Sequence, residues 1–402
     1  MQSLKELYKI GIGPSSSHTI GPERIAEFIK GKYRDCTDYK VVLYGSLALT
    51  GKGHGTDSVL KRVLGENTVI IFNTEEKDLP HPNVMDVFVY KNGKELKKIR
   101  AISVGGGSIK IDGEKFEEPE SIYFLTTFTD VKNYVLNKGI KLYDYVYETE
   151  PDIKEYLKKI WSVMKESVER GLSKDGVLPG GLNVAKKAKF IYKSDDIFVR
   201  DSLLRNKLTC AYALAVAEEN ADNGTIVTAP TCGAAGVLPA VLYYAYKNEH
   251  VLEDVIINAL ATAGLIGNFV KTNASVSGAE CGCQAEIGTA CSMAAAAIAE
   301  IFNLSVDQIE CAAEVAMEHN LGLTCDPVLG LVQVPCIERN TMAAMRAFDS
   351  FCVAYYLAPM RKIPFDVIVK TMYETGKDLN KKYLETARGG IAKNYNYKGK
   401  KD

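Results

Sequence analysis

The pattern of apolar and polar residues changes part-way along the chain. Between residues 41 and 128, short β-branched or alternating runs are separated by Asn-Gly and Gly-rich breaks, which is typical of strands and hairpins. A helix is predicted over residues 22–30, because Pro22 suits a first helical turn. The predicted strand runs are residues 41–49, 67–72, 84–90, 99–104, 105–113 and 121–128. This part of the chain is therefore predicted to be an α+β domain.

A helical pattern begins near residue 149. The stretch TEPD at 149–152 has the composition of a helix start, and apolar residues recur at helical spacing from Ile153 until Gly171. Alanine-rich, weakly charged segments follow, and small residues allow apolar helices to pack closely. We therefore predict an α+β domain over residues 1–148, followed by an all-α domain over residues 149–402.

Three loop-like segments interrupt the helical pattern, at residues 223–236, 271–288 and 318–340. Each combines Gly or Pro with small hydroxyl or amide groups, and loops of this kind between apolar helices usually line a site. They contain Cys232, Cys281, Cys283, Cys325 and Cys336. The spacing of these cysteines fits no zinc-finger or ferredoxin pattern, so it leaves metal ligands and small buried apolar side chains both open.

Composition and charge exclude some classes of protein. The 402 residues have a formal net charge of -1, which gives no global field to attract nucleic acid or an anionic membrane surface. The N-terminus lacks the apolar core of a signal peptide, so we expect a cytoplasmic protein whose ten cysteines form no disulfide framework. Residues 225–246 carry no charge, but Pro230, Pro239 and a polar segment argue against a membrane span.

Histidine is scarce, and four of the five histidines lie in polar turns. These are His18, His54, His81 and His319, where a side chain with a pKa near ~6.5 can transfer protons. The turn GPSSSHTIGP leads into the helix predicted from Pro22, so its hydroxyl and N–H groups can face an anion at the positive end of that helix. A serine-rich helix cap with nothing bound is the alternative.

Nine motifs follow one another along nearly the whole chain. They read GPSSSHTIGP, KGHGTD, HPN, SVGGG, LPGGLNV, TAPTCGAAGVLPAVL, KTNASVSGAECGCQAEIGTACSMAAAA, GLTCDPVLGLVQVPCIERN and ARGG. Together they resemble the iron-sulfur-dependent L-serine dehydratases of bacteria in their single-chain form. The resemblance implies a homodimeric lyase that converts L-serine to pyruvate and ammonia. It also implies that the first domain resembles an amino-acid-binding regulatory module.

The resemblance further implies an oxygen-labile [4Fe-4S] cluster held by three cysteines, with one iron left open. Matching motif to motif assigns these ligands to Cys283, Cys325 and Cys336. Cys281 stands where the family pattern has a residue other than cysteine, so a spare thiol and an alternative ligand are both open there; Cys232 is not assigned to the cluster. Several single-chain members end in a cysteine that reaches the open iron, whereas this sequence has none after Cys352, so water or another side chain is expected there.

The same resemblance implies roles for further residues. The base that removes the Cα proton is expected to be His54 or His18, at an active site between the two domains. Arg339 suits a carboxylate because its planar guanidinium binds bidentately, although an ion pair with Glu338 or another carboxylate is equally open. The predicted substrate-binding residues are Ser16, Ser17, Thr19, Lys271, Asn273 and Arg339.

Two other functions compete with this one. A pyridoxal-phosphate dehydratase could use Gly105–Gly107 to hold a phosphate, but these glycines lie between two predicted strands, and the chain shows no convincing Schiff-base lysine motif. A non-enzymatic metal or amino-acid sensor could use the same cysteines. The histidine turns argue against a sensor, because a sensor needs no proton acceptor beside an open metal.

Overall fold

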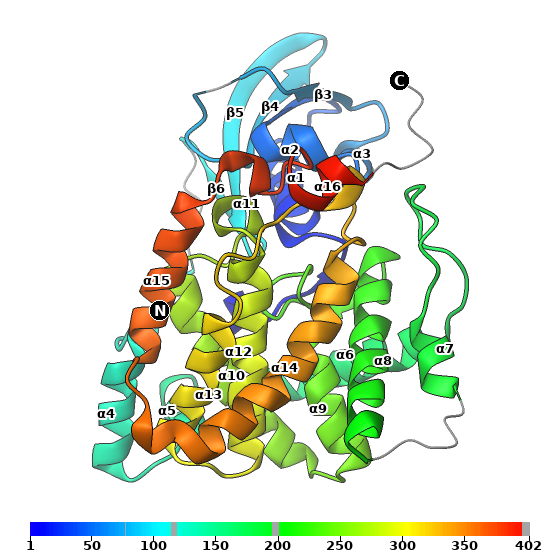
Figure 1. The fold of residues 1–402 in the computed structure, drawn as a ribbon. Helices are drawn as coiled ribbons and strands as arrows, with labels where there is room; N and C mark the ends of the chain where they lie inside the picture. The colour runs from blue at the N-terminus through cyan, green and yellow to red at the C-terminus, as the bar shows by residue number, and fades with distance from the viewer. Residues whose placement is uncertain (77, 114–118, 195–200, 396–402) are drawn as a thin grey trace.

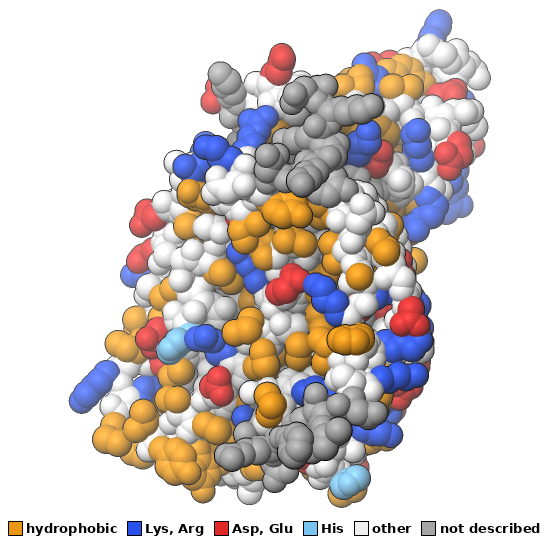
Figure 2. Space-filling view, turned by 45° about the vertical axis from the view of Figure 1, so that its right-hand side comes forward, with side chains coloured by type: hydrophobic (Ala, Val, Ile, Leu, Met, Phe, Trp, Pro, Cys, Tyr) orange, Lys and Arg blue, Asp and Glu red, His pale blue; other side chains and the backbone are white. Residues whose placement is uncertain are grey.

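The computed structural model describes residues 1–76, 78–113, 119–194 and 201–395. A small lobe built around a β-sheet sits on a larger lobe of helices (Figure 1). The α+β region followed by a largely helical region confirms the fold class predicted from the sequence. On the face shown in Figure 2, acidic and basic side chains are interspersed, in keeping with the near-zero net charge.

The small lobe contains a five-stranded sheet in the order β3-β2-β4-β5-β6. β2 and β3 are parallel, and the other neighbours are antiparallel. The strands are β2 Asp38–Tyr44, β3 Val69–Asn73, β4 Val84–Lys91, β5 Lys94–Gly105 and β6 Ser108–Ile111. α1 (Gly21–Lys32) and α3 (Thr56–Leu64) contribute Ile25, Ile29 and Leu60 to the core that covers one sheet face, where alternate strand residues point.

Two of the predicted strands are wrong: the one at residues 41–49 in part, and the one at residues 121–128 as a whole. Residues 41–49 continue β2 only to Tyr44; Gly45 then adopts a φ of +53°, and α2 (Gly45–Thr50) begins. Residues 121–128 form no strand beyond one bridge at Ser121. Their N–H groups at Ile122 and Tyr123 both bind the Met1 carbonyl, and Thr127 caps α4. The predicted helices at 22–30 and from Ile153 are confirmed as α1 and α6.

The helical lobe packs around α10 and α12. Most residues of both helices are buried, because alanine and glycine let neighbouring helices approach closely. α10 is long and apolar enough to cross a membrane by length and composition, but 78% of its most apolar window is buried inside the fold, as expected of a core helix. The helices are α4 Phe128–Lys138, α5 Leu142–Thr149, α6 Ile153–Ser173, α7 Ala188–Lys193, α8 Asp201–Ala221, α9 Val237–Asn248, α10 Glu253–Asn273, α11 Gly278–Cys281, α12 Thr289–Ile301, α13 Val306–Glu318, α14 Cys336–Leu357, α15 Phe365–Asp378 and α16 Gly390–Asn394.

Both ends of the described chain cross between the lobes. Residues 1–8 are packed in the helical core, where the Tyr8 hydroxyl donates to the Leu260 carbonyl (3.0 Å). β1 (Ile10–Ile12) then pairs with β7 (Thr225–Val227) and leads into the SSSHT turn. At the other end, the chain leaves α15 and returns to the small lobe near α2, as the red segment in Figure 1 shows. The predicted histidine and cysteine loops therefore meet at the junction of the lobes.

Candidate active site

The two histidine turns lie side by side in the small lobe. His18 belongs to a π-helical turn, Ser16–Ile20, that continues into α1, and His54 lies in the turn between α2 and α3. Their ring centroids are 4.4 Å apart, and both side chains are fully buried. The Thr19 hydroxyl donates to the His54 carbonyl (2.8 Å), and the Thr56 hydroxyl donates to the His18 carbonyl (2.5 Å). These reciprocal bonds fix the two turns relative to each other.

The hydrogen bonds of His54 determine which ring nitrogen is free. Nδ1 lies 2.9 Å from the Thr50 carbonyl oxygen, which can only accept, so Nδ1 carries the proton. Nε2 therefore has a lone pair, and this buried atom has no hydrogen-bond partner among the described residues. Burial lowers the pKa of His54 to about 4. His54 is thus a neutral imidazole with an unoccupied acceptor at neutral pH.

His18 has both ring nitrogens engaged. Ser46 donates its hydroxyl proton to the Glu385 carbonyl (2.7 Å), so its oxygen accepts from His18 Nε2 (3.0 Å). Nδ1 then accepts from the Ser17 hydroxyl (2.8 Å). Burial, followed by the neighbouring His54, holds the pKa of His18 well below its ordinary value. His18 is therefore arranged to hold its neighbours, whereas His54 is arranged to accept a proton.

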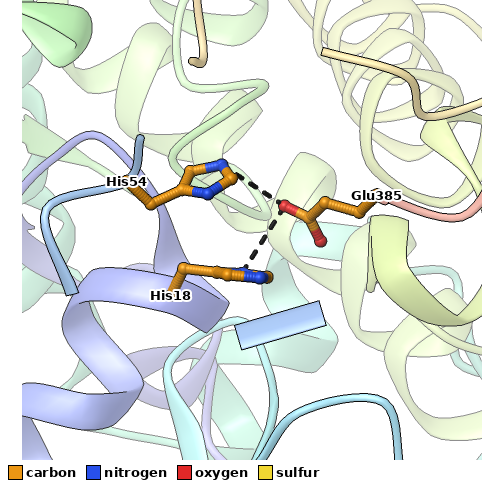
Figure 3. Close-up of side chains that lie close together, drawn as sticks. All are labelled: His18, His54 and Glu385. Atoms are coloured by element: carbon orange, nitrogen blue, oxygen red, sulfur yellow. Dashed lines mark ion pairs between the residues drawn. The ribbon is translucent and has the colours of Figure 1, made fainter. Parts of the chain in front are cut away.

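Glu385 completes this group, and the sequence reasoning missed it. Its Oε1 lies 3.6 Å from both His18 Nδ1 and His54 Nε2, as Figure 3 shows, although it comes from the far end of the chain. Parallel bonds position it: Cys325 N–H donates to the Tyr383 carbonyl (2.8 Å), and Glu385 N–H donates to the Cys325 carbonyl (2.7 Å). The φ of +57° at Glu385 is uncommon for a residue other than glycine. The sequence alone does not reveal this backbone conformation.

The three predicted cysteine ligands line one small pocket beside His54. Cys283 lies just after α11, Cys325 lies in the loop between α13 and α14, and Cys336 begins α14. All three side chains are buried and line the pocket. Glu286 joins them: one ligand atom each from Cys283, Glu286 and Cys325 lies within 4.8 Å of the others. The inner pocket, as we call it, has a volume of about 20 Å³ and is also lined by Glu385.

Electrostatics favour a thiolate at Cys283, whereas the neighbouring Cys283 raises the pKa of Cys325 and burial raises that of Cys336 well above the ordinary value. A hydrogen bond from the Cys325 thiol lowers the pKa of Cys283 to about 7, with a further contribution from Arg339. The pKa of Cys325 is raised well above its ordinary value, because its thiol donates to the Cys283 thiolate. Thiolates are the form in which cysteine binds metals. The cluster of thiols beside a buried guanidinium is therefore suited to a metal centre.

Close backbone approaches bring these loops together. A Cβ on Gly278 would lie 3.0 Å from the Cys325 sulfur and 2.6 Å from the Glu286 carboxylate. A Cβ on Gly53 would lie 2.7 Å from the Leu329 carbonyl, so the GHG turn needs glycine to pack on the loop that carries Cys325. The glycines of the predicted motifs thus position the histidine pair against the cysteines.

Comparison with known proteins agrees with this arrangement. Residues 72–392 match the family model described as serine dehydratase alpha chain, and residues 3–67 match the serine dehydratase beta chain. L-serine dehydratase 1 of Escherichia coli is 39% identical, covering 98% of this chain and 99% of its own. The L-serine dehydratases of Streptomyces coelicolor and Haemophilus influenzae are 40% and 37% identical, each across 98% of this chain and 98% and 99% of theirs, respectively.

The chain belongs to the serine dehydratase family. Serine dehydratases of this alpha and beta type are lyases of the iron-sulfur class. In this member the alpha-chain match contains the three pocket cysteines and Glu385, and the beta-chain match contains His18 and His54. The site is thus assembled across the two matched parts of the serine dehydratase chain.

The other two cysteines of the loops lie differently in this serine dehydratase. Cys281 packs against α15, where a Cβ on Gly376 would lie 2.8 Å from its sulfur. Its thiol pKa is raised to about 12 by burial, and it does not line the inner pocket. Cys232 offers its backbone N–H to the Ser16 hydroxyl (2.7 Å) and does not line the pocket either. The geometry therefore favours Cys283 over Cys281.

The predicted hydroxyl groups of the SSSHT turn are used for positioning. Ser16 accepts from Cys232, Ser17 donates to His18, and Thr19 donates to the His54 carbonyl. Ser15, which the sequence reasoning did not single out, lines the inner pocket. The role of Ser16, Ser17 and Thr19 in binding substrate stays a prediction.

Of the remaining predicted residues, Arg339 lies beside Cys283 without lining the inner pocket, and Asn273 and Lys271 are not among the residues that line it. Arg339 forms an ion pair with Asp326 (3.4 Å) and donates to the Thr324 carbonyl, whereas Glu338 pairs with Lys187. The Asn273 amide binds the Thr126 and Phe269 carbonyls. Lys271 lines a separate cleft and binds Gln2 and Glu6.

A larger cleft leads toward the serine dehydratase site from outside. This outer cleft has a volume of about 680 Å³ and is lined by Thr19, by the GHG turn and by residues 331–333. It shares Pro14, His54 and Val332 with the inner pocket. His54 thus stands where a small molecule entering the cleft would meet the cysteines.

Proposed function

We propose that the protein is an L-serine dehydratase that converts L-serine to pyruvate and ammonia at this junction. Cys283, Cys325 and Cys336 would hold a [4Fe-4S] cluster with one iron left open, and His54 would act as the base. The observation that carries the proposal is that His54 Nε2 accepts no hydrogen bond from the described residues and that His54 lines a buried pocket together with three thiols. The names and near full-length similarity of the relatives support the choice of L-serine.

The residues present fit an iron-sulfur cluster by their donor chemistry. Iron-sulfur clusters are held by cysteine thiolates in an otherwise apolar setting, and three cysteines leave one iron of four without a protein ligand. The nearby Arg339 and the neutral histidines suit an anionic group. The pocket volume of about 20 Å³ has room for little more than a water molecule.

An open iron supplies a Lewis acid that stabilises the departing hydroxide of serine. The protein's own contribution is to remove the Cα proton. His54 is suited to this step because Thr50 holds its Nδ1–H, which leaves the Nε2 lone pair toward the pocket. Burial keeps Nε2 unprotonated at neutral pH, so no proton must leave the base before it acts.

The surrounding residues position that base. His18 packs against the His54 ring and is fixed by Ser17 and Ser46. Loss of the Cα proton and of hydroxide gives 2-aminoacrylate, which tautomerises and hydrolyses to pyruvate and ammonia without further help.

A cytoplasmic location and a homodimeric assembly stay predictions.

Activity of the anaerobically prepared protein tests the proposal. We expect iron-loaded protein kept under argon to form pyruvate from L-serine, and to lose both its broad visible absorption and its activity in air. Pyruvate is followed by a coupled assay, and iron and sulfide are measured on the same sample. A borohydride-sensitive lysine imine would instead indicate a pyridoxal-phosphate enzyme. Tight serine binding with no pyruvate from fully loaded protein would indicate a sensor.

The pH dependence of turnover tests the role of His54. The base is active when unprotonated, and its pKa of about 4 lies below the ordinary value of 6.5. The active form therefore stays populated as the pH falls from about 8 to about 5, and kcat/KM for L-serine is expected to show no acid limb near pH 6.5. The cluster absorbance at each pH provides the control. An acid limb centred near pH 6.5 with intact absorbance would contradict this assignment.

A further inference from the structure

A second cleft separates the small lobe from the helical lobe on the other side of the SSSHT turn. It has a volume of about 470 Å³, and it shares no lining residue with the outer cleft or the inner pocket. One wall is formed by Arg24 of α1 and by the β5–β6 turn. The helical lobe contributes Lys271, near the end of α10, and residues 274–276 to its lining.

Three half-buried cations meet at this cleft from separate elements, and a fourth, exposed cation, Lys110, also lines it. Lys271 and Arg24 line it, and Lys9, which precedes β1, lies beside them: its ammonium donates to the Gly106 carbonyl (3.0 Å). Arg24 donates to the next carbonyl, that of Gly107. Lys271 donates to the Gln2 side-chain oxygen and to the Glu6 carbonyl, both at 3.0 Å. The partners of Arg24 and Lys271 among these bonds are uncharged.

Among the residues that the structure describes, negative charge at the cleft does not balance these cations. Glu6 pairs with Lys9 (3.1 Å) and is the one carboxylate that the three cations share. The other acidic lining residue, Glu280, is held by Lys377 (2.6 Å) and by Ser275. Burial is the largest cause that lowers the pKa of Lys271 to about 7; repulsion from Lys9 and Arg24 lowers it further, and Glu6 opposes the shift.

Free donors remain for a ligand. An ammonium group has three N–H donors, and Lys271 uses two of them in the bonds described; a guanidinium has five, and Arg24 uses one. The Ser108 side chain also lines the cleft. The β5–β6 turn keeps the wall close, because Gly105 has a φ of +107° and a Cβ there would lie 3.0 Å from the Ser277 side chain. This turn is the GGG motif, whose carbonyls anchor two of the cations.

We propose that this basic cleft is a binding site for a small anion carrying two or more negative charges, of the phosphate or dicarboxylate class. Lys271 and Arg24 would bind it, with Lys9 adding charge from behind the β5–β6 turn. Bonds from these cations to an anion, in which both partners are charged, are stronger than the bonds to uncharged oxygens that Arg24 and Lys271 now make. The site is separate from the proposed active site and does not depend on the proposed reaction.

Binding is tested on the iron-loaded protein by melting and calorimetric titration with inorganic phosphate and with malonate, at constant ionic strength set by chloride. We expect saturable stabilisation by at least one of the two anions, weakened at least tenfold in Lys271→Met and in Arg24→Gln. Lys94→Met, a change at an exposed lysine of the β4–β5 hairpin, is the matched control and is expected to bind like wild type. Response to phosphate alone indicates a phosphate-bearing ligand, and response to malonate alone a carboxylate.

The melting temperatures of the variants without added anion show whether each variant is folded before binding is measured. Removing a poorly compensated cation relieves repulsion, so Lys271→Met is expected to melt no lower than wild type before anion is added. Binding by His54→Gln should equal that of wild type, which separates this cleft from the proposed active site. The proposal fails if neither anion gives a saturable response, or if Lys271→Met and Arg24→Gln respond as wild type does.

Discussion

Replacing Cys283, Cys325 or Cys336 by serine is expected to abolish the brown colour and to lower L-serine turnover by about 10³-fold or more. Each of the three thiols lines the inner pocket, and removal of one leaves too few thiolates to retain the cluster. A Lewis acid contributes several kcal/mol to transition-state stabilisation, and each 1.36 kcal/mol corresponds to about tenfold in rate. Iron and sulfide per chain, visible absorption and pyruvate formation are measured together on anaerobic samples.

Cys281→Ser is the matched control, because Cys281 lies two residues from Cys283. Its sulfur packs against α15 at Gly376, so we expect iron content and turnover to remain near those of wild type. Folding of each variant is checked by its circular dichroism. Retention of full iron by one of the three pocket variants would remove that residue from the ligand set. Loss of iron in Cys281→Ser would make Cys281 the ligand in place of Cys283.

Local chemistry made the outline of the fold predictable. Pro22 and the apolar spacing from Ile153 correctly indicated α1 and α6, because a few neighbouring residues determine where a helix starts and which of its faces is apolar. The errors arose where distant contacts decide the structure. Residues 121–128 look like a strand, but the N–H groups of Ile122 and Tyr123 bind the carbonyl of Met1, more than a hundred residues away.

The candidate site shows the same division. Motif resemblance pointed to both histidines and to the three cysteines, which the structure brings to one junction. It could not indicate Glu385, because the carboxylate reaches the site only through pairing of its segment with Cys325. The neighbouring ARGG motif has a physical reason as well. A Cβ on Gly390 would lie 1.8 Å from Asp326, the partner of Arg339, so this turn must be glycine.

Spacing alone also could not decide between Cys281 and Cys283. The two residues are separated only by Gly282, which has a φ of +74° and a backbone that approaches the Leu323 carbonyl. That turn directs the two sulfurs to different surroundings, one toward α15 and the other toward the pocket. The same tertiary packing separates Lys271 from the inner pocket, although it lies only twelve residues before Cys283 in the sequence.

The second large effect is expected at His54. His54→Gln should lower kcat for L-serine by about 10² to 10⁴-fold, the usual contribution of a positioned general base, while iron content and visible absorption stay unchanged. Glutamine keeps much of the volume of the buried ring, and its amide can still donate to the Thr50 carbonyl that now holds Nδ1. What the variant lacks is the Nε2 lone pair toward the pocket.

His18→Asn is the informative comparison, because the two histidines share burial, ring contact and proximity to Glu385. Both nitrogens of His18 are occupied by serine hydroxyls, so its loss should disturb the position of His54 and reduce kcat less than His54→Gln does. Exchange of the Cα proton of L-serine with deuterated solvent separates the two roles. We expect exchange to disappear in His54→Gln and to persist, more slowly, in His18→Asn. The reverse pattern, with cluster absorption intact in both variants, would make His18 the base.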